Sequence, residues 1–406
     1  MSSRESTTLW GLYHVEQLYQ SLLIRTDAGI AKLLSGPYWT WKALCAILAI
    51  SLFRAFPNYD ALGTLFFETK WRDAQVKFDH PLIDTSRIFP AGSHESNLTF
   101  RLTVPILARV FHLHEAGLLI FFGLVGVMLL YLVLKVAFTL SASKRVAFLV
   151  CLTTACTWPG AAAFQELRGG YYDALALCLL VSACATPSSL LAAIFLFLAA
   201  WTDERALIAS MFVFLLYAGR FSAHGDTAGI RRFLVGKPAA VVVAAAAYVG
   251  TRAYLTSTHS YLHAASGIGL SILSQQINVI PLAIWTGLGG SWILVCVGLL
   301  ALFLEKRYLA AVGFSAALVG VIVASLAVAD VTRSMAYCLP AVFVGLAALS
   351  SSEGINQLEQ LAAIGAAISV LVPTYYLEGN AGLWWLYPLP MQMARWLWAW
   401  ASQHVL

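Results

Sequence analysis

Residues 116–138 read AGLLIFFGLVGVMLLYLVLKVAF, an apolar run in which Lys135 carries the only charge. A helix needs about 20 mostly apolar residues to cross the roughly 30 Å hydrocarbon core of a bilayer. This run is long enough, so it predicts a membrane-spanning helix.

The composition extends this prediction to the whole chain. Of the 406 residues, 60% are hydrophobic and 11% are charged, whereas a soluble domain has about 45–50% apolar and 25% charged residues. We therefore expect an all-α, polytopic membrane protein of about 11 spans, within a range of about 10 to 12. The other predicted spans are residues 39–56, 146–164, 171–185, 190–201, 206–217, 238–255, 281–304, 308–329, 334–349 and 361–376.

Basic residues in the short loops predict how the spans are oriented. Taking the runs in order places these residues on the side where the chain begins, and the positive-inside rule assigns that side to the cytoplasm. Residues 171–185 and 190–201 are shorter than the roughly 17 residues of a full span, so this pair is tilted, broken or re-entrant. The basic residues are Lys144, Arg145, Arg220, Arg231, Arg232, Lys237, Lys306 and Arg307.

Three parts of the chain differ in character. Residues 1–38 mix charges with a helical spacing of leucines, which predicts a cytoplasmic amphipathic segment on the membrane surface. Residues 39–382 form a single membrane domain. Residues 383–406 are rich in tryptophan and interrupted by Pro388 and Pro390, so they form either an interfacial helix or one last span.

Residues 57–115 are the most densely polar part of the chain and form the first extracytoplasmic loop of the predicted topology. Apolar residues are interspersed with charges over residues 61–76 and 100–113. This pattern predicts amphipathic helices that lie along the membrane surface.

The chain shows no sign of a nucleic-acid or metal partner. Its net charge of +5 is modest and distributed over short loops, which does not suggest binding to nucleic acid. The seven cysteines all fall in apolar runs without the spacing of metal ligands, so we interpret them as small hydrophobic residues. We expect no metal site and no cofactor.

Polar groups gather at the predicted outer ends of the spans. Charges there are costly unless they pair or face a water-filled cavity, so they indicate a functional site. A carboxylate can take the proton of an acceptor hydroxyl while guanidinium groups stabilise a leaving phosphate, and a lipid-borne donor can arrive sideways from the bilayer.

Several stretches at these outer ends match a known group of enzymes. They are Phe56-Pro57-Asn58-Tyr59-Asp60, FRLTVPILA at 100–108, YYDALA at 171–176, TDERAL at 202–207 and DVTR at 330–333. Together with the long first outer loop, these stretches resemble bacterial members of the GT-C superfamily, polytopic glycosyltransferases that use polyprenyl-phosphate sugars.

The resemblance implies the roles of particular residues. It makes Asp60 the candidate for the catalytic base, with Glu166, Asp173 and Glu204 as alternatives. It places donor and acceptor among His94, Arg101, Glu166, Arg168, Asp173, Glu204, Arg205, Asp330 and Arg333. No Asp-x-Asp or Glu-x-Asp pair lies near Asp60, which favours a metal-independent enzyme. The resemblance implies that the enzyme inverts the anomeric centre. The implied partners are a polyprenyl-phosphate sugar donor, a glycan or lipid-linked acceptor and membrane lipids. The implied location is a bacterial inner (cell) membrane, with the site facing the periplasm or the exterior.

Each of these residues also has a structural interpretation. Asp60 can cap a surface helix, Glu204 and Arg205 can form an ion pair at a helix end, and Asp330 with Arg333 has the spacing of a local pair.

Two other functions fit the same spans. A secondary transporter or flippase would place its charges near the bilayer midplane on broken helices. An oligosaccharide polymerase or ligase would carry its large loop late in the chain, whereas the large loop of this chain comes first.

Overall fold

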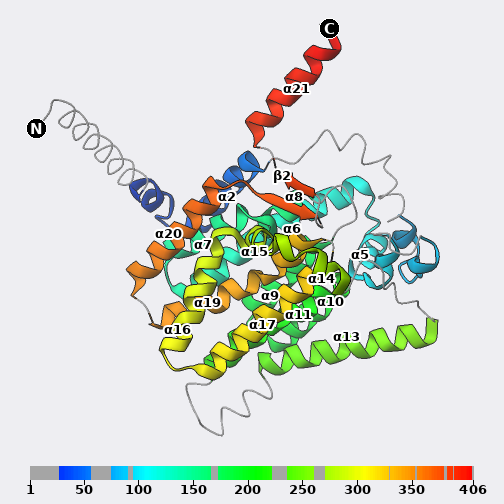
Figure 1. The fold of residues 1–406 in the computed structure, drawn as a ribbon, viewed down its shortest axis with the longest axis horizontal. Coiled ribbons are helices and arrows are strands. Elements are labelled where there is room, and N and C mark those ends of the chain that lie inside the picture. Colours follow the sequence, from blue (N-terminus) through cyan, green and yellow to red (C-terminus); the bar gives the residue numbers. More distant parts are fainter. Residues whose placement is uncertain are drawn as a thin grey trace, which may run out of the picture.

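The chain folds into a mostly helical body with one small strand pair (Figure 1). The computed structural model describes residues 27–55, 75–89, 95–165, 172–221, 236–259, 270–328, 330–352, 354–378, 382–386 and 388–404. The longer helices of the body are α2 (Trp39–Arg54), α6 (Glu115–Ser141), α7 (Lys144–Ala155), α8 (Trp158–Gln165), α9 (Asp173–Ala185), α10 (Ser189–Thr202), α11 (Arg205–Phe221), α13 (Lys237–His259), α15 (Ile280–Leu288), α16 (Trp292–Leu304), α17 (Tyr308–Leu326), α19 (Leu339–Ser352) and α20 (Ile355–Leu371).

The helices support the prediction of a membrane protein. Within the described residues, five helical stretches are long and apolar enough to cross a bilayer: Gly117–Ser141, Lys237–Thr258, Ile277–Leu304, Tyr308–Leu326 and Val331–Ser352. The bent pair α7 and α8 makes a sixth if it is one span, and α9, α10, α11 and α20 are shorter apolar helices.

The predicted span 146–164 is broken in its middle. Helix α7 ends at Ala155 and α8 begins at Trp158, and their axes meet at 61°. Proline fits the first turn of a helix but not its interior, so Pro159 favours a new helix start here. Gly160 is needed at the bend because a Cβ at that position would lie 2.5 Å from the Ala155 Cα.

The two short predicted spans, 171–185 and 190–201, form the separate helices α9 and α10, which pack against each other. Pro187 follows the end of α9. The Ser188 hydroxyl then caps α10 by accepting a hydrogen bond from the Leu191 amide at 3.3 Å.

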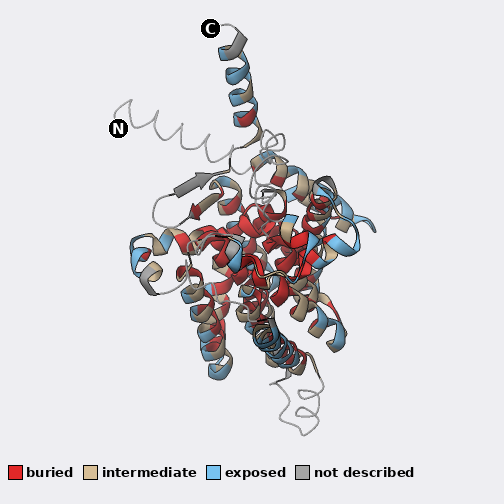
Figure 2. Cartoon of the chain, turned by 90° about the vertical axis from the view of Figure 1, so that its right-hand side faces the viewer, coloured by how far each residue is buried: buried red, intermediate tan, exposed pale blue. Residues whose placement is uncertain are grey.

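The stretch Val331–Ser352 lies at the centre of the body. It comprises α18 (Val331–Met335), a single 3₁₀ turn over Ala336–Cys338 and α19, and 83% of its apolar window is buried. Figure 2 shows the buried residues gathered in the middle of the helical body, with exposed residues around them. Side chains placed early on this stretch are therefore surrounded by protein.

Small residues allow helices to approach closely around this centre. A Cβ added to Gly345 of α19 would lie 2.4 Å from the Leu294 carbonyl oxygen of α16, and one added to Gly298 would lie 2.5 Å from the Gly345 Cα. Backbone contact of this kind is typical of helix pairs in membranes.

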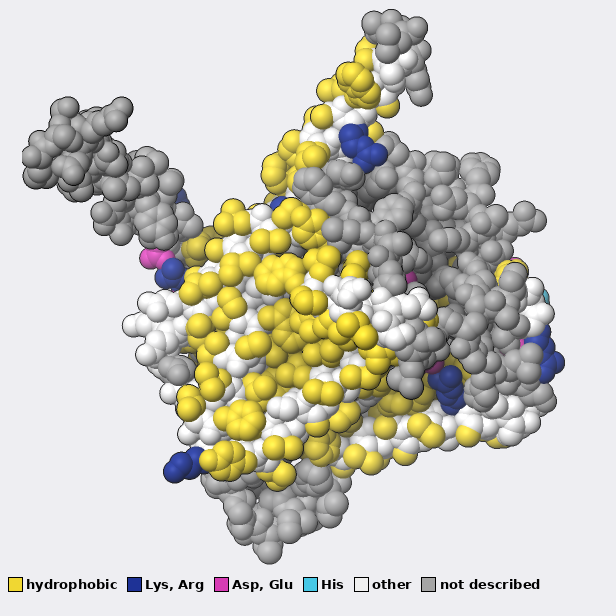
Figure 3. All heavy atoms as spheres, viewed as in Figure 1, with side chains coloured by type: hydrophobic (Ala, Val, Ile, Leu, Met, Phe, Trp, Pro, Cys, Tyr) yellow, Lys and Arg dark blue, Asp and Glu magenta, His cyan; other side chains and the backbone are white. Residues whose placement is uncertain are grey.

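Apolar side chains cover the face of the body that α16 and α17 present, with Lys and Arg at its margins (Figure 3). Strongly exposed residues there include Leu300, Leu304, Leu309, Val312 and Val319. A contiguous apolar surface of this size is typical of contact with lipid or another membrane protein.

The prediction of a helix over 361–376 is wrong at its end. Helix α20 stops at Leu371, before Pro373, and the chain continues in strand β1 (Tyr375–Glu378), which pairs antiparallel with β2 (Gly382–Trp385). Aromatic and branched residues favour strands, and Tyr375 pairs in register with Trp385.

Other predicted segments are described in part. Helix α5 (Thr103–Val110) occupies the middle of the expected surface helix 100–113, whereas 61–74 lies outside the described residues. Helix α21 (Leu389–His404) extends away from the body and exposes Leu397, Trp398 and Trp400 (Figure 1). Whether α21 lies at the interface or crosses the membrane stays a prediction.

The close approach of α16 and α19 gives a testable prediction. We expect Gly345→Ala to lower the stability of the protein by about 1–3 kcal/mol, because the new methyl group forces the two backbones apart. Gly320→Ala in α17 is the matched control, since a Cβ there meets nothing within 4 Å and alanine favours a helix over glycine. The midpoint of thermal unfolding in detergent measures both, and equal midpoints would contradict the packing described here.

Candidate functional site

Six charged side chains from distant parts of the chain meet in one network, called here the Asp173 cluster. The cluster lies where α9, α11 and α18 begin, next to the end of α10 and the start of α5. Its members are Arg101, Asp173, Asp203, Arg205, Asp330 and Arg333.

Asp173 is the centre of the cluster and is fully buried. Its Oδ1 accepts hydrogen bonds from Arg205 Nη2 at 2.7 Å and Tyr337 Oη at 3.1 Å. Its Oδ2 accepts from Arg333 Nε at 2.7 Å and lies 2.6 Å from Arg333 Nη2. Both carboxylate oxygens are therefore occupied by donors from other helices.

Arg205 joins the end of α10 to the start of α11. Its guanidinium holds Asp203 through two hydrogen bonds, Nε to Oδ1 at 2.7 Å and Nη2 to Oδ2 at 2.6 Å. Its Nη1 donates to Ser334 Oγ at 2.6 Å, and the group lies 5.1 Å from the centre of the Tyr337 ring. A two-point contact fixes the carboxylate in orientation as well as distance.

Arg333 links the centre of the cluster to the strand pair. Its Nη1 donates to Asp330 Oδ2 at 2.6 Å, which confirms the local pair predicted from their spacing. Tyr376 of β1 donates to Asp330 Oδ1 at 3.1 Å, and the Leu377 amide donates to Thr332 Oγ1 at 2.8 Å. The hairpin is thereby docked against α18.

Arg101 reaches the cluster from the first loop. Its Nη2 lies 3.2 Å from Asp203 Oδ2. Two bonds to the last turn of α10 hold the adjacent backbone: the Leu102 amide donates to the Trp201 carbonyl at 2.8 Å, and Thr103 Oγ1 donates to the Leu198 carbonyl at 2.8 Å. The Trp201 carbonyl lies in the last turn of α10, where carbonyls have no partner within the helix, so it can anchor the backbone that leads into α5.

The charges of the cluster balance, with three guanidinium groups against three carboxylates. Burial makes each of these charges costly unless it is paired. Since the oxygens of Asp173 and Asp203 are already engaged by arginines, these carboxylates hold helices together and have no free oxygen to take a proton from a substrate.

Glu204 does not join the cluster, contrary to the expected pair with Arg205. Its carboxylate accepts from Arg252 Nη1 of α13 at 2.7 Å, and its side chain is 47% exposed. Arg252 also donates to Tyr248 Oη at 2.6 Å and lies 4.1 Å from the centre of the Phe100 ring. Arg252 therefore contacts Phe100, which precedes Arg101, and Glu204, which follows Asp203.

The sequence prediction found most of the cluster but missed some members. It named Arg101, Asp173, Arg205, Asp330 and Arg333 and left out Asp203, although Asp203 adjoins Glu204 in the quoted TDERAL motif. It also missed the partners Ser334, Tyr337 and Tyr376, of which Tyr337 stands at the helical spacing of four residues from Arg333. The predicted residues Asp60, His94, Glu166 and Arg168 lie outside the described residues.

A second set of contacts organises the described part of the first loop. Lys77 is fully buried, and its Nζ donates to the carbonyls of Ile83 at 3.0 Å and Thr99 at 2.8 Å. The Thr99 hydroxyl donates to Asp84 Oδ1 at 3.2 Å. Burial lowers the pKa of Lys77 to about 7, although Asp84 opposes the shift.

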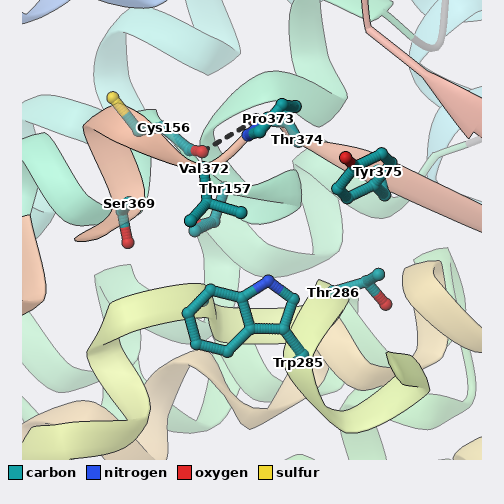
Figure 4. A pocket seen from close by; sticks show the side chains of 10 residues that line it. Cys156, Thr157, Trp285, Thr286, Ser369, Val372, Pro373, Thr374 and Tyr375 are labelled. Atoms are coloured by element: carbon teal, nitrogen blue, oxygen red, sulfur yellow. Dashed lines mark hydrogen bonds between the residues drawn. The ribbon is translucent and has the colours of Figure 1, made fainter. Parts of the chain in front are cut away.

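A cavity of about 20 Å³ lies at the bend between α7 and α8 (Figure 4). It is lined by Thr157, Trp285, Ser369 and Thr374 among others, and Thr374 Oγ1 donates to the Cys156 carbonyl at 2.8 Å. This volume holds about one water molecule. The cavity is therefore too small for a sugar or a lipid phosphate.

The cluster predicts a large effect of one substitution. Asp173→Asn leaves Arg205 and Arg333 buried without their shared countercharge, so we expect a loss of about 3–5 kcal/mol of stability. Asp79→Asn, at an exposed position of the first loop, is the control and should change stability by less than about 0.5 kcal/mol. Thermal unfolding of the purified protein measures both, and similar midpoints would show that the cluster is not what holds these helix ends.

The buried lysine predicts a dependence on pH. Between the folded pKa of about 7 and the ordinary value of 10.5, the unfolded chain binds the proton and the folded chain does not. Stability should therefore rise with pH across this window. We expect Lys77→Met to flatten the plot of unfolding midpoint against pH from about 7 to 10, whereas Lys32→Met, at an exposed position, should keep the slope of the unmodified protein. If Lys77→Met leaves the slope unaltered, the pH dependence of stability does not come from the buried Lys77.

Among the described residues, no group of three or more His, Cys, Asp or Glu side chains is placed to hold a metal ion. No protein-family model, no curated protein and no solved structure matches this chain. The interpretation of the Asp173 cluster therefore rests on the residues of this chain.

Proposed function

We propose that this chain is an integral membrane glycosyltransferase of the GT-C type, which moves a sugar from a polyprenyl-phosphate donor to an acceptor on the extracytoplasmic side. The observation that carries the proposal is the position of the Asp173 cluster. Its arginines and carboxylates lie at helix ends beside the long first loop, where a lipid-borne phosphate and a glycan or lipid-linked acceptor can meet.

The proposal includes eleven spans, as the sequence predicted. The six stretches that pass the length test, with the bent pair taken as one, are joined by α2 and the four shorter helices α9, α10, α11 and α20. Arg145, at the start of α7, lies 3.7 Å from Glu359 of α20 and also pairs with Asp27. These contacts form a second charged group, which lies where α7 and α20 begin.

The proposed reaction is a single displacement. The acceptor hydroxyl oxygen attacks the anomeric carbon, the bond from that carbon to the donor phosphate oxygen breaks, and polyprenyl phosphate leaves with the electron pair. A carboxylate takes the hydroxyl proton, and attack opposite the leaving group inverts the anomeric centre. The residues hold no metal in this proposal.

Asp60 remains the candidate for the base. The carboxylates of Asp173 and Asp203 are engaged by arginines, so the group that accepts the proton has to come from elsewhere. Asp60 begins the first loop, in the same predicted compartment as the cluster. His94, Glu166 and Arg168 keep their predicted roles at the substrate.

The test is turnover of polyprenyl-phosphate sugars by purified protein. We expect Asp60→Asn to reduce turnover about 10²- to 10⁴-fold, the usual contribution of a general base. Asp79→Asn, which changes another acidic residue of the same loop, should leave turnover unaltered. Full activity of Asp60→Asn would remove it as the base, and transport of an unaltered solute into proteoliposomes would replace the proposal by a transporter.

A further inference from the structure

Two buried donors beside the Asp173 cluster have no hydrogen-bond partner among the described residues. They are the Tyr172 hydroxyl and Arg101 Nη1. The Tyr172 side chain is 1% exposed, and that of Arg101 is 15% exposed. An unpaired buried donor is costly and uncommon in a folded protein. Both groups therefore indicate a ligand or a water molecule at this place.

Both donors belong to residues that are linked to carboxylates of the cluster. Tyr172 directly precedes Asp173, and Arg101 pairs with Asp203 through its other amino group. Asp173 and Asp203 both accept hydrogen bonds from Arg205 Nη2. The two unpaired donors are thus each linked, through a carboxylate, to the same arginine.

The surroundings fix both donors in position. The Tyr172 ring lies parallel to the Phe122 ring of α6, with 6.4 Å between their centres. The backbone beside Arg101 is anchored to α10 through Leu102 and Thr103. Neither group needs to be ordered when a ligand arrives, which favours binding.

Arg101 is the cation of the cluster with the weakest pairing. Asp203, its partner at 3.2 Å, is held more tightly by Arg205 through contacts of 2.6 and 2.7 Å. Arg333, by comparison, contacts two carboxylates at 2.6 to 2.7 Å. An anion beside Arg101 would therefore gain a countercharge without breaking a strong pair.

We infer that Arg101 Nη1 and Tyr172 Oη form a binding subsite for a phosphate oxygen. Identifying the ligand as the phosphate of a polyprenyl lipid rests on the proposed function, whereas free phosphate offers the same chemistry. An arginine and a phenol donate to an oxyanion with charge-assisted hydrogen bonds. Tyr172 thereby becomes a substrate-contacting residue.

The test is direct binding to the full-length protein in detergent, without turnover. The probes are decaprenyl phosphate, uncharged decaprenol and inorganic phosphate. We expect Arg101→Gln and Tyr172→Phe each to weaken decaprenyl phosphate binding about tenfold or more. Binding of decaprenol should be weak and equal in all variants. If inorganic phosphate competes with decaprenyl phosphate, the site binds free phosphate. If it does not compete, the site binds the lipid phosphate.

A second readout separates binding from folding. Tyr172→Phe removes a hydroxyl without a partner, so the unfolding midpoint of the ligand-free protein should stay the same or rise while affinity falls. Tyr217→Phe is the matched control: its buried hydroxyl donates to the Cys184 carbonyl, so its midpoint should fall while affinity is unchanged. A Tyr172→Phe protein with unchanged affinity for both phosphate probes would mean that water alone satisfies these donors and would overturn the inference. If the protein binds decaprenyl phosphate in this way but transfers no sugar, the proposed function is wrong and the inferred subsite stands.

Discussion

The buried carboxylate of Asp173 is the interaction on which this end of the molecule depends. It accepts from Arg205 at the start of α11 and from Arg333 and Tyr337 in the central stretch Val331–Ser352. A lone carboxylate could not be buried there, and neither could either arginine alone. The helix starts are therefore held in one arrangement by the need to keep opposite charges in contact.

The same network determines where the irregular segments lie. The loop is tied to α10 through Arg101 and the first residues of α5, and the strand pair is tied to α18 through Asp330 and Thr332. Arg252 adds a contact from α13 to both Glu204 and Phe100. Contacts with the Asp173 cluster thus hold together segments that are far apart in the sequence. They also fix the position of the described part of the loop relative to the helices.

Hydropathy predicted the helices well because each long apolar run has only one way to satisfy its backbone within a bilayer. It predicted less where the chain leaves the apolar environment, as at Pro373 and the following strand pair. It also predicted that Asp173, Arg205 and Arg333 would meet, because a consistent topology brings their helix starts to one side. It did not predict that Asp203 would face this centre and Glu204 would face Arg252. The side chains of two adjacent acidic residues at a helix end point in different directions. Which of them faces the cluster depends on how α10 and α11 are rotated about their axes.

The arrangement of donors bears on the kind of function this site can have. A transporter needs charged groups that exchange partners as its halves move, but Asp173 has donors on both oxygens from two helices, and Asp203 is held at two points by Arg205. Exchange of such partners would require several strong contacts to break together. A rigid, neutral cluster with two unpaired donors at one edge is better suited to positioning a bound anion. Under the proposed function, the reacting groups would come to the cluster from outside it, while its own carboxylates stay paired with arginines.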